Sequence, residues 1–203
     1  MSTDTKINEI DHFNEWSRKY DRSWIQHYAR PIHQDMLDAA SGLVAAPQTI
    51  LDVGCGTGQL LMKAAARWPS ARCIGVDPSP GMVAIAQSQA RGATIHLGNA
   101  ESVPVESSSA DIVFSSISFH HWSDQSKGLR EIARVLRPHG CLCLADLTMP
   151  HWLAGIIRHV NIKEPSDMIR LFTEAGFRVT LQRRTFTRFA LLTLGVKDSG
   201  RIV

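Results

Sequence analysis

Short apolar strands alternate with helices through the middle of this chain, and that alternation limits the fold more than any other feature. The sequence predicts five strands in this part, at 49–53, 72–76, 94–97, 111–117 and 141–145. Helices are expected between them, at 59–67, from Ser79 to Gly92, and from Ser123 to the breakers Pro138 and Gly140. No hairpin signal separates these strands, so each connection is a crossover and the strands are expected to lie parallel.

The C-terminal part of the chain has a different pattern. A helix is expected over 166–175, and two strands follow it at 177–186 and 188–196, joined by a turn too short for a crossover. Such a pair of strands has to be antiparallel. The predicted fold is therefore α/β: a Rossmann-like, doubly wound sheet of seven strands, mostly parallel with an antiparallel C-terminal strand.

An N-terminal helical cap is expected to precede the sheet. Residues 10–45 carry aromatic side chains four positions apart, which is the spacing of one helix face. Pro31 suits the first turn of a second helix within this segment. Neither an internal repeat nor a linker interrupts the 203 residues, so a single domain is expected.

Composition argues against several classes of protein. The net charge of +3 is too small to indicate a nucleic-acid-binding protein. No apolar run is long enough to span a membrane, and the polar N-terminus does not resemble a signal peptide, so the expected location is the cytoplasm. The four cysteines form no Cys-x-x-Cys pair, and Cys141 and Cys143 would share one face of a strand. Buried free thiols are therefore expected, rather than a disulfide or a zinc site.

The strongest local signal is the run ILDVGCGTG at 50–58, which ends a strand and opens a helix. Glycines allow a sharp turn there and a close approach of a ligand to the backbone. A dinucleotide fingerprint would need glycine at position 59, where this chain has Gln59. Asp52 would repel a pyrophosphate but suits an ammonium or a sulfonium group.

Two further polar positions follow the next two strands. Asp77 ends the second strand, where an acid can accept hydrogen bonds from both hydroxyls of a ribose. The alternative is that Asp77 only stabilises the turn before the helix that Ser79 caps. Asn99 follows the third strand and could pair with the amine of an adenine, although Gly98-Asn99 is also an ordinary turn.

At this point the chain resembles a known family, the class I S-adenosylmethionine-dependent methyltransferases of the small-molecule type related to ubiquinone and menaquinone C-methyltransferases. The stretches that carry the resemblance are ILDVGCGTGQL (50–60), IGVDPSPGMVAIA (74–86), GNAESVP (98–104), ADIVFSSISFHHW (110–122) and LREIARVLRPHGCLCLADL (129–147). They come in the family's order and with its spacing. The resemblance implies S-adenosylmethionine as cofactor, S-adenosylhomocysteine as product and a small-molecule acceptor.

The resemblance also implies which residues hold the cofactor. Carried over position by position, they are Tyr20 as a lid residue; Asp52, Gly54 and Gly56 around the methionine part, with Ser115 or Ser116 facing it; Asp77 at the ribose, with Pro78 beside it in the chain as a further cofactor-binding residue; and Met82, Asn99 and Ala100 around the adenine. In one respect the chain departs from the family, which usually has Asp where Asn99 stands.

The candidates for catalysis follow the fourth and fifth strands. His120 or His121 could take a proton from a hydroxyl or amine acceptor, and Trp122 could face the sulfonium through a cation–π contact. Asp146 and His151 are further candidate bases. The alternative is that one histidine and the tryptophan are simply packed in the core. No metal site is expected, since adjacent histidines at a strand end should point apart.

The chain is thus expected to divide into a helical cap at 1–45, a cofactor-binding core at 46–147, a substrate-side segment at 148–165 and a C-terminal helix with its strand pair at 166–203. The apolar wall of the acceptor pocket would come from Trp16, Trp24, Trp152, Ile156 and Ile157. The partners expected are the acceptor, with a homodimer left open, and neither nucleic acid nor a membrane. A nicotinamide-dependent oxidoreductase and a non-catalytic S-adenosylmethionine-binding protein remain as alternatives.

Overall fold

The computed structural model describes residues 25–148, 161–185 and 190–198. Its elements, in chain order, are α2 (Ile25–Ser41), β1 (Thr49–Val53), α3 (Gln59–Arg67), β2 (Arg72–Asp77), α4 (Pro80–Gln89), β3 (Thr94–Leu97), β4 (Ala110–Ser116), the 3-10 turn η1 (Phe119–His121), α5 (Gln125–Val135), β5 (Leu136–Leu147), α7 (Pro165–Glu174), β6 (Phe177–Arg184) and β7 (Ala190–Lys197).

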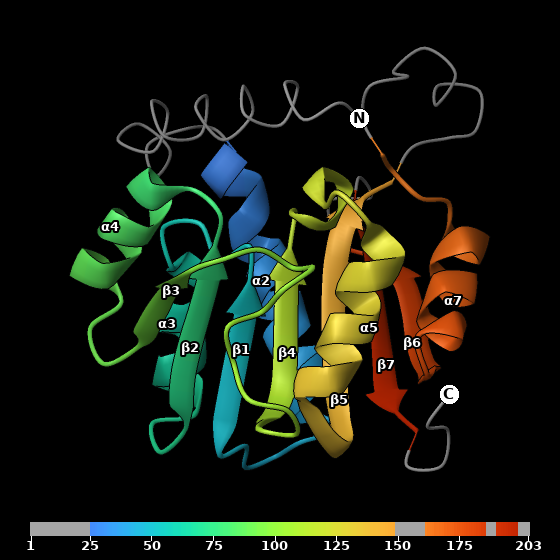
Figure 1. Cartoon of the computed structure of the whole chain (residues 1–203), viewed down its shortest axis with the longest axis horizontal. Coiled ribbons are helices and arrows are strands. Elements are labelled where there is room, and N and C mark those ends of the chain that lie inside the picture. The colour runs from blue at the N-terminus through green and yellow to red at the C-terminus, as the bar shows by residue number, and fades with distance from the viewer. Residues whose placement is uncertain (1–24, 149–160, 186–189, 199–203) are drawn as a thin grey trace.

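The strands form one sheet of seven in the order β3-β2-β1-β4-β5-β7-β6 (Figure 1). The pairs from β3 to β5 are parallel. The last strand, β7, lies between β5 and β6 and runs antiparallel to both, so β6 forms this edge of the sheet. The predicted α/β class, the number of strands and the antiparallel C-terminal strand are all confirmed.

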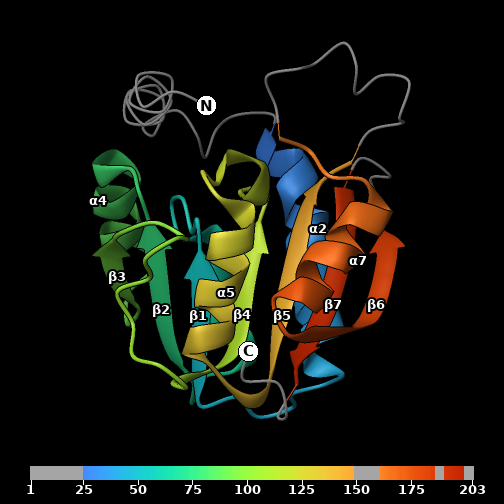
Figure 2. The same ribbon diagram turned by 45° about the vertical axis from the view of Figure 1, so that its right-hand side comes forward.

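Helices cover both faces of the sheet and give it two apolar cores. One core joins α2, α3 and α4 to residues such as Ile50, Phe114 and Cys143. The other joins α5 and α7 to Leu51, Val113 and their neighbours, and Figure 2 shows these two helices side by side on one face with α2 behind the sheet. Because the central strands are covered on both faces, β1 is buried along its whole length.

The four cysteine thiols are buried and free, as the sequence predicts. All four cysteines are free and buried, and Cys141 and Cys143 lie in the same core. Burial raises the pKa of Cys143 well above its ordinary value, which keeps this thiol protonated. Among the described helices, none is long and apolar enough to cross a membrane.

Three local predictions were wrong. Pro31 does not open a second helix, because it lies inside α2. Helix α5 begins after Asp124, whose carboxylate accepts from Lys127 N at 2.8 Å, and it ends at Val135. The segment with Pro138 and Gly140 is already part of β5. A register shift against β4 and a φ of 63° at His139 accommodate these residues in a strand.

Candidate functional site

The candidate site lies at the carboxyl ends of β1, β2 and β4. The chain runs from β1 outwards to β2 and β3, and then returns to build β4 and β5 on the other side of β1. Ligands of open α/β sheets bind at such a reversal of strand order. Two neighbouring cavities open here, and both are lined by Gly54, Gly56, Ser116 and Ile117.

We name each cavity after its carboxylate. The Asp52 cavity is also lined by Ala29 and His33 from α2, by Cys55 and Thr57 from the glycine loop, and by Gln59 and Leu60 from α3. The Asp77 cavity is also lined by Pro78, Ser79, Met82, Ser118 and His121. The two cavities share their middle wall, so one elongated ligand could occupy both.

The glycine loop has the backbone conformation that its sequence requires. Gly54, Gly56 and Gly58 have φ values of 75°, 53° and 83°, a region that favours glycine. Gly54 N and Cys55 N both donate to Val76 O, at 2.8 and 3.1 Å, which fixes the loop against the end of β2. These hydrogen bonds therefore hold the loop firmly at the carboxyl ends of β1 and β2.

Asp77 connects this loop to the next helix. Its Oδ2 accepts from Gly56 N at 2.8 Å and its Oδ1 accepts from Ser79 N at 2.9 Å. Ser79 in turn caps α4 by accepting from Met82 N at 3.2 Å. Asp77 thus does stabilise the turn, which the sequence analysis treated as the alternative to ribose binding. The two functions are compatible, because a carboxylate oxygen can accept more than one hydrogen bond.

Asp52 is in a different electrostatic state. It is 2% exposed, and within the described part of the chain its Oδ1 has no hydrogen-bond partner. Burial, followed by the nearby charge of Asp77, raises the pKa of Asp52 to about 8. A positive group entering the Asp52 cavity would favour the ionised form of this carboxyl.

The turn after β4 is strained. Ile117 has a φ of 50°, which is rare for a β-branched residue, and its N–H donates to Ala145 O at 2.8 Å. This turn brings Ser118 against the glycine loop so closely that a Cβ on Gly54 would lie 1.9 Å from Ser118 Oγ. Only glycine fits at position 54 while the turn keeps this conformation.

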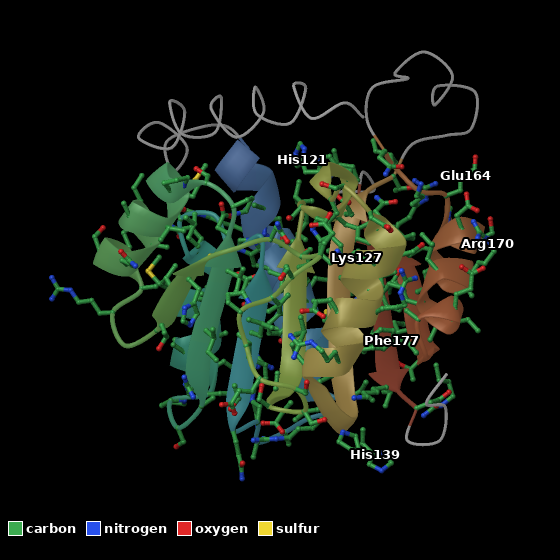
Figure 3. All side chains as sticks on the ribbon, in the orientation of Figure 1. His121, Lys127, His139, Glu164, Arg170 and Phe177 are labelled. Atoms are coloured by element: carbon green, nitrogen blue, oxygen red, sulfur yellow. The ribbon has the colours of Figure 1, made fainter. Side chains whose placement is uncertain are left out.

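The structure brings together two catalytic candidates from different strands. His120 Nδ1 and Asp146 Oδ1 lie 2.6 Å apart, and Asp146 Oδ2 accepts from His120 N at 2.6 Å. The expectation that adjacent histidines point apart was wrong, because η1 places the rings of His120 and His121 with centroids 3.9 Å apart. His121 lines the Asp77 cavity, and Figure 3 shows it at the opposite end of the sheet from His139.

Across residues 25–148, 161–185 and 190–198, no group of three or more His, Cys, Asp or Glu side chains is arranged to hold a metal ion. His120 already has a carboxylate partner.

The remaining predicted residues lie at varying distances from the cavities. Met82 and Pro78 line the Asp77 cavity, whereas Asn99 is exposed and Ala100 is buried in the core. Trp122 packs edge-to-face on Phe119 with ring centroids 4.9 Å apart, and it donates to Ser118 Oγ at 3.3 Å. It lines neither cavity. Tyr20, Trp16, Trp24, His151, Trp152, Ile156 and Ile157 lie outside the described residues.

Sequence reasoning missed His33, which lines the Asp52 cavity and is 6% exposed. Burial and the charge of Lys63 lower its pKa to about 3, so the imidazole is neutral. A signal was present in the sequence: His33 stands four residues after Ala29 and four before Leu37, both buried, so it interrupts an apolar helix face.

The chain is similar to known methyltransferases. Residues 51–144 match the family described as "Methyltransferase domain". The chain is 39% identical to a malonyl-[acyl-carrier protein] O-methyltransferase of Dechloromonas aromatica, over 76% of this chain and 63% of that protein. The chain thus spans less than two thirds of the length of this curated relative.

Solved structures agree on the fold. A chain of the complex between the Haloferax volcanii Trm112 methyltransferase activator and a methyltransferase superposes with a TM-score of 0.80 at 22% identity, over 92% of this chain and 97% of that one. The [4+2]-cyclase SpnF superposes with a TM-score of 0.71 at 20% identity, over 88% and 83%. The fold therefore occurs in proteins whose names denote different reactions.

Proposed function

We propose that this chain is a class I S-adenosylmethionine-dependent methyltransferase and that it transfers a methyl group from S-adenosylmethionine to a small-molecule acceptor. One observation carries the proposal: a glycine loop and two buried carboxylates border two adjoining cavities at the point where the strand order reverses. The nicotinamide-dependent oxidoreductase is not favoured, since the family match and the curated relative are methyltransferases.

The residues present fit this cofactor. Asp77 would accept hydrogen bonds from the ribose with lone pairs that Gly56 N and Ser79 N leave available. Met82 would pack on the adenine ring from the wall of the Asp77 cavity. The amino-acid end would enter the Asp52 cavity, where the unpartnered oxygens of Asp52 and Ser116 provide acceptors for an ammonium group.

When bound, S-adenosylmethionine supplies the methyl group of its sulfonium. Once that methyl group is transferred, the sulfonium becomes a neutral thioether, which makes it a good leaving group. The task left to this chain is to hold the acceptor in line and to exclude water. Ile117 contributes rigidity, because its backbone N–H donates to Ala145 O and the residue lines both cavities.

His121 is the residue we propose to take a proton from an acceptor hydroxyl or amine. It lines the Asp77 cavity, and the ring of His120 lies against it. His120 and Asp146 would act as positioning residues, because their two contacts fix both the backbone of η1 and the orientation of the His120 ring.

Native mass spectrometry and thermal melting test the cofactor. We expect S-adenosylhomocysteine to raise the melting temperature, with a gain of about 2.7 kcal/mol at ~100 times its Kd, and NAD to have no effect. Stabilisation by NAD alone would contradict the proposal. Transfer of a labelled methyl group to any of a panel of small acceptors would then separate the enzyme from a non-catalytic binder.

A pH profile tests the base. Rates should rise with pH through the titration of a histidine, and His121→Ala should remove that rise while leaving the Kd of S-adenosylhomocysteine nearly unchanged. An unchanged profile in His121→Ala would remove this residue from the chemistry. His96→Ala, on β3, serves as the matched control because His96 lines neither cavity.

A further inference from the structure

His33 occupies a place in the Asp52 cavity that no cofactor motif accounts for. It comes from α2, whose first turns reach the edge of the sheet where β1 and β4 end (Figure 1). The glycine loop, Asp52 and Ser116 line the same cavity. A helix outside the sheet thus brings an imidazole into the cavity that the sheet's own ligand-binding groups line.

The polar atoms of this cavity lack partners. Within the described part of the chain, His33 Nδ1, Asp52 Oδ1 and Ser116 Oγ are buried without a hydrogen bond. A buried polar atom without a partner is costly, and native proteins rarely keep several in one place. Their convergence on one cavity indicates a polar ligand that satisfies them.

The cavity is also polarised. Lys63, on α3, does not line the cavity, but it lies close enough to His33 for its charge to help lower the pKa of the imidazole, and its Nζ donates to Arg30 O at 3.2 Å. A positive charge therefore lies behind the helical side of the cavity. The strand wall carries Asp52, with Asp77 close behind it. A zwitterion with its carboxylate towards the helices and its ammonium towards the strands would match both walls.

The choice of group for each wall follows from hydrogen-bonding capacity. Asp52 can only accept once it is ionised, so it suits the ammonium. A neutral imidazole can donate from one nitrogen, and Nδ1 is the nitrogen without a partner. A carboxylate beside His33 would receive this hydrogen bond and the attraction of Lys63 together.

Given the function proposed above, we infer that His33 is a cofactor-binding residue, whose Nδ1–H donates a hydrogen bond to the carboxylate of the cofactor's amino-acid end. This residue selects a ligand that carries a carboxylate. A nucleoside thioether without that group should lose only this interaction and keep those of the Asp77 cavity.

The test compares two ligands on three proteins. Calorimetry would give the Kd of S-adenosylhomocysteine and of its decarboxylated analogue, which keeps the amine, for wild type, His33→Leu and His33→Asn. We expect His33→Leu to weaken S-adenosylhomocysteine at least tenfold and the analogue less than twofold. His33→Asn should recover most of the affinity, because its amide nitrogen can replace Nδ1. His96→Leu is the matched control.

Each result is decisive. Equal losses for both ligands, or no loss for either, would overturn the inference and leave the proposed function intact. Failure of the wild type to bind either ligand would overturn the proposed function, and the inference with it. Should His33→Leu fail to fold, labelled histidine in the wild type gives the answer by NMR: the His33 imidazole signals should shift with S-adenosylhomocysteine and stay in place with the analogue.

Discussion

The two cavities of the site are built on opposite principles. In the Asp77 cavity each carboxylate oxygen accepts a hydrogen bond from a backbone amide, and the two bonds hold the glycine loop and the start of α4. In the Asp52 cavity the carboxylate, the Ser116 hydroxyl and the His33 imidazole keep buried atoms unpartnered, among the described residues. Asp77 therefore stabilises the fold through its hydrogen bonds, whereas the fold positions the polar groups of the Asp52 cavity. Substitutions in the two halves should affect stability and binding in different proportions.

Gly56 belongs to both cavities, so its replacement should have the largest effect. Gly56→Val places a β-branched residue at a φ of 53°, which costs about 1–3 kcal/mol of stability. The new side chain would also fill the space between the cavities. We expect binding of S-adenosylhomocysteine to fall more than ~100-fold, about 2.7 kcal/mol. Normal binding by calorimetry would show that the loop is not the cofactor cradle.

Asp77 should matter for both stability and binding. Asp77→Ala removes a charged acceptor from two backbone amides, a loss of about 2–4 kcal/mol in the free energy of unfolding. Affinity for S-adenosylhomocysteine should fall at least ~10-fold, since the ribose loses its partner. A melting curve beside a titration measures both. If the ligand-free protein melts at the wild-type temperature, the contrast between the cavities is wrong.

Asp52 should act mainly on how the stability of the protein changes with pH. Its carboxyl, with a pKa raised to about 8 from an ordinary 3.8, holds a proton in the folded state that the unfolded chain releases, so stability falls as pH rises between these values. His33, with a pKa lowered to about 3 from 6.5, has the opposite slope below pH 6.5. From pH 6.5 to about 8 the slope of Asp52 remains, up to about 1.4 kcal/mol per pH unit.

Chemical unfolding of the wild type and Asp52→Asn at pH 6.5, 7.25 and 8 checks this expectation. The variant should lose most of the decline in stability with pH. A decline of the same size in both proteins would place the responsible proton elsewhere. Burial also raises the pKa of Asp77, so this carboxyl changes stability with pH in the same direction as Asp52.

The smallest expected effect is at Ser79, which lines the Asp77 cavity but works as a helix cap. Ser79→Ala should lower the free energy of unfolding by about 1 kcal/mol and leave the affinity for S-adenosylhomocysteine within about twofold. Thermal melting and calorimetry decide together. A large loss of affinity without loss of stability would make Ser79 a ligand contact instead of a structural one.

The local part of the site was predictable from the sequence. The glycine loop and Asp77 each follow an apolar strand, and their neighbours in the chain determine their geometry. The place of His33 in the Asp52 cavity and the pairing of His120 with Asp146 depend on contacts between distant segments. The break in the apolar face of α2 marks His33 in the sequence, but it does not show which groups His33 faces. The resemblance supplied the remaining positions, and for Trp122 the described contacts are those of a core residue.

The sequence predicted the fold in outline, but it placed the ends of some helices and strands wrongly, because these ends also depend on contacts between distant segments. Alternating apolar segments indicate a parallel sheet regardless of where each element ends. Pro138 and Gly140 look like the end of a helix, yet pairing with β4 draws this segment into β5. Pro31 looks like the start of a helix, but α2 continues through it while packing against β4 and β5. In both places tertiary packing outweighed local preference.

The order of strands also bears on when a ligand can act during folding. The walls of the Asp52 cavity come from α2, β1, α3 and β4, so they meet only after the chain has left β1, built β2 and β3, and returned. A partly folded chain with β1 and β2 alone would lack Ser116 and Ile117. The cofactor should therefore bind late and leave the refolding rate nearly unchanged, while it slows unfolding. The cofactor would stabilise the completed sheet and would take no part in its nucleation.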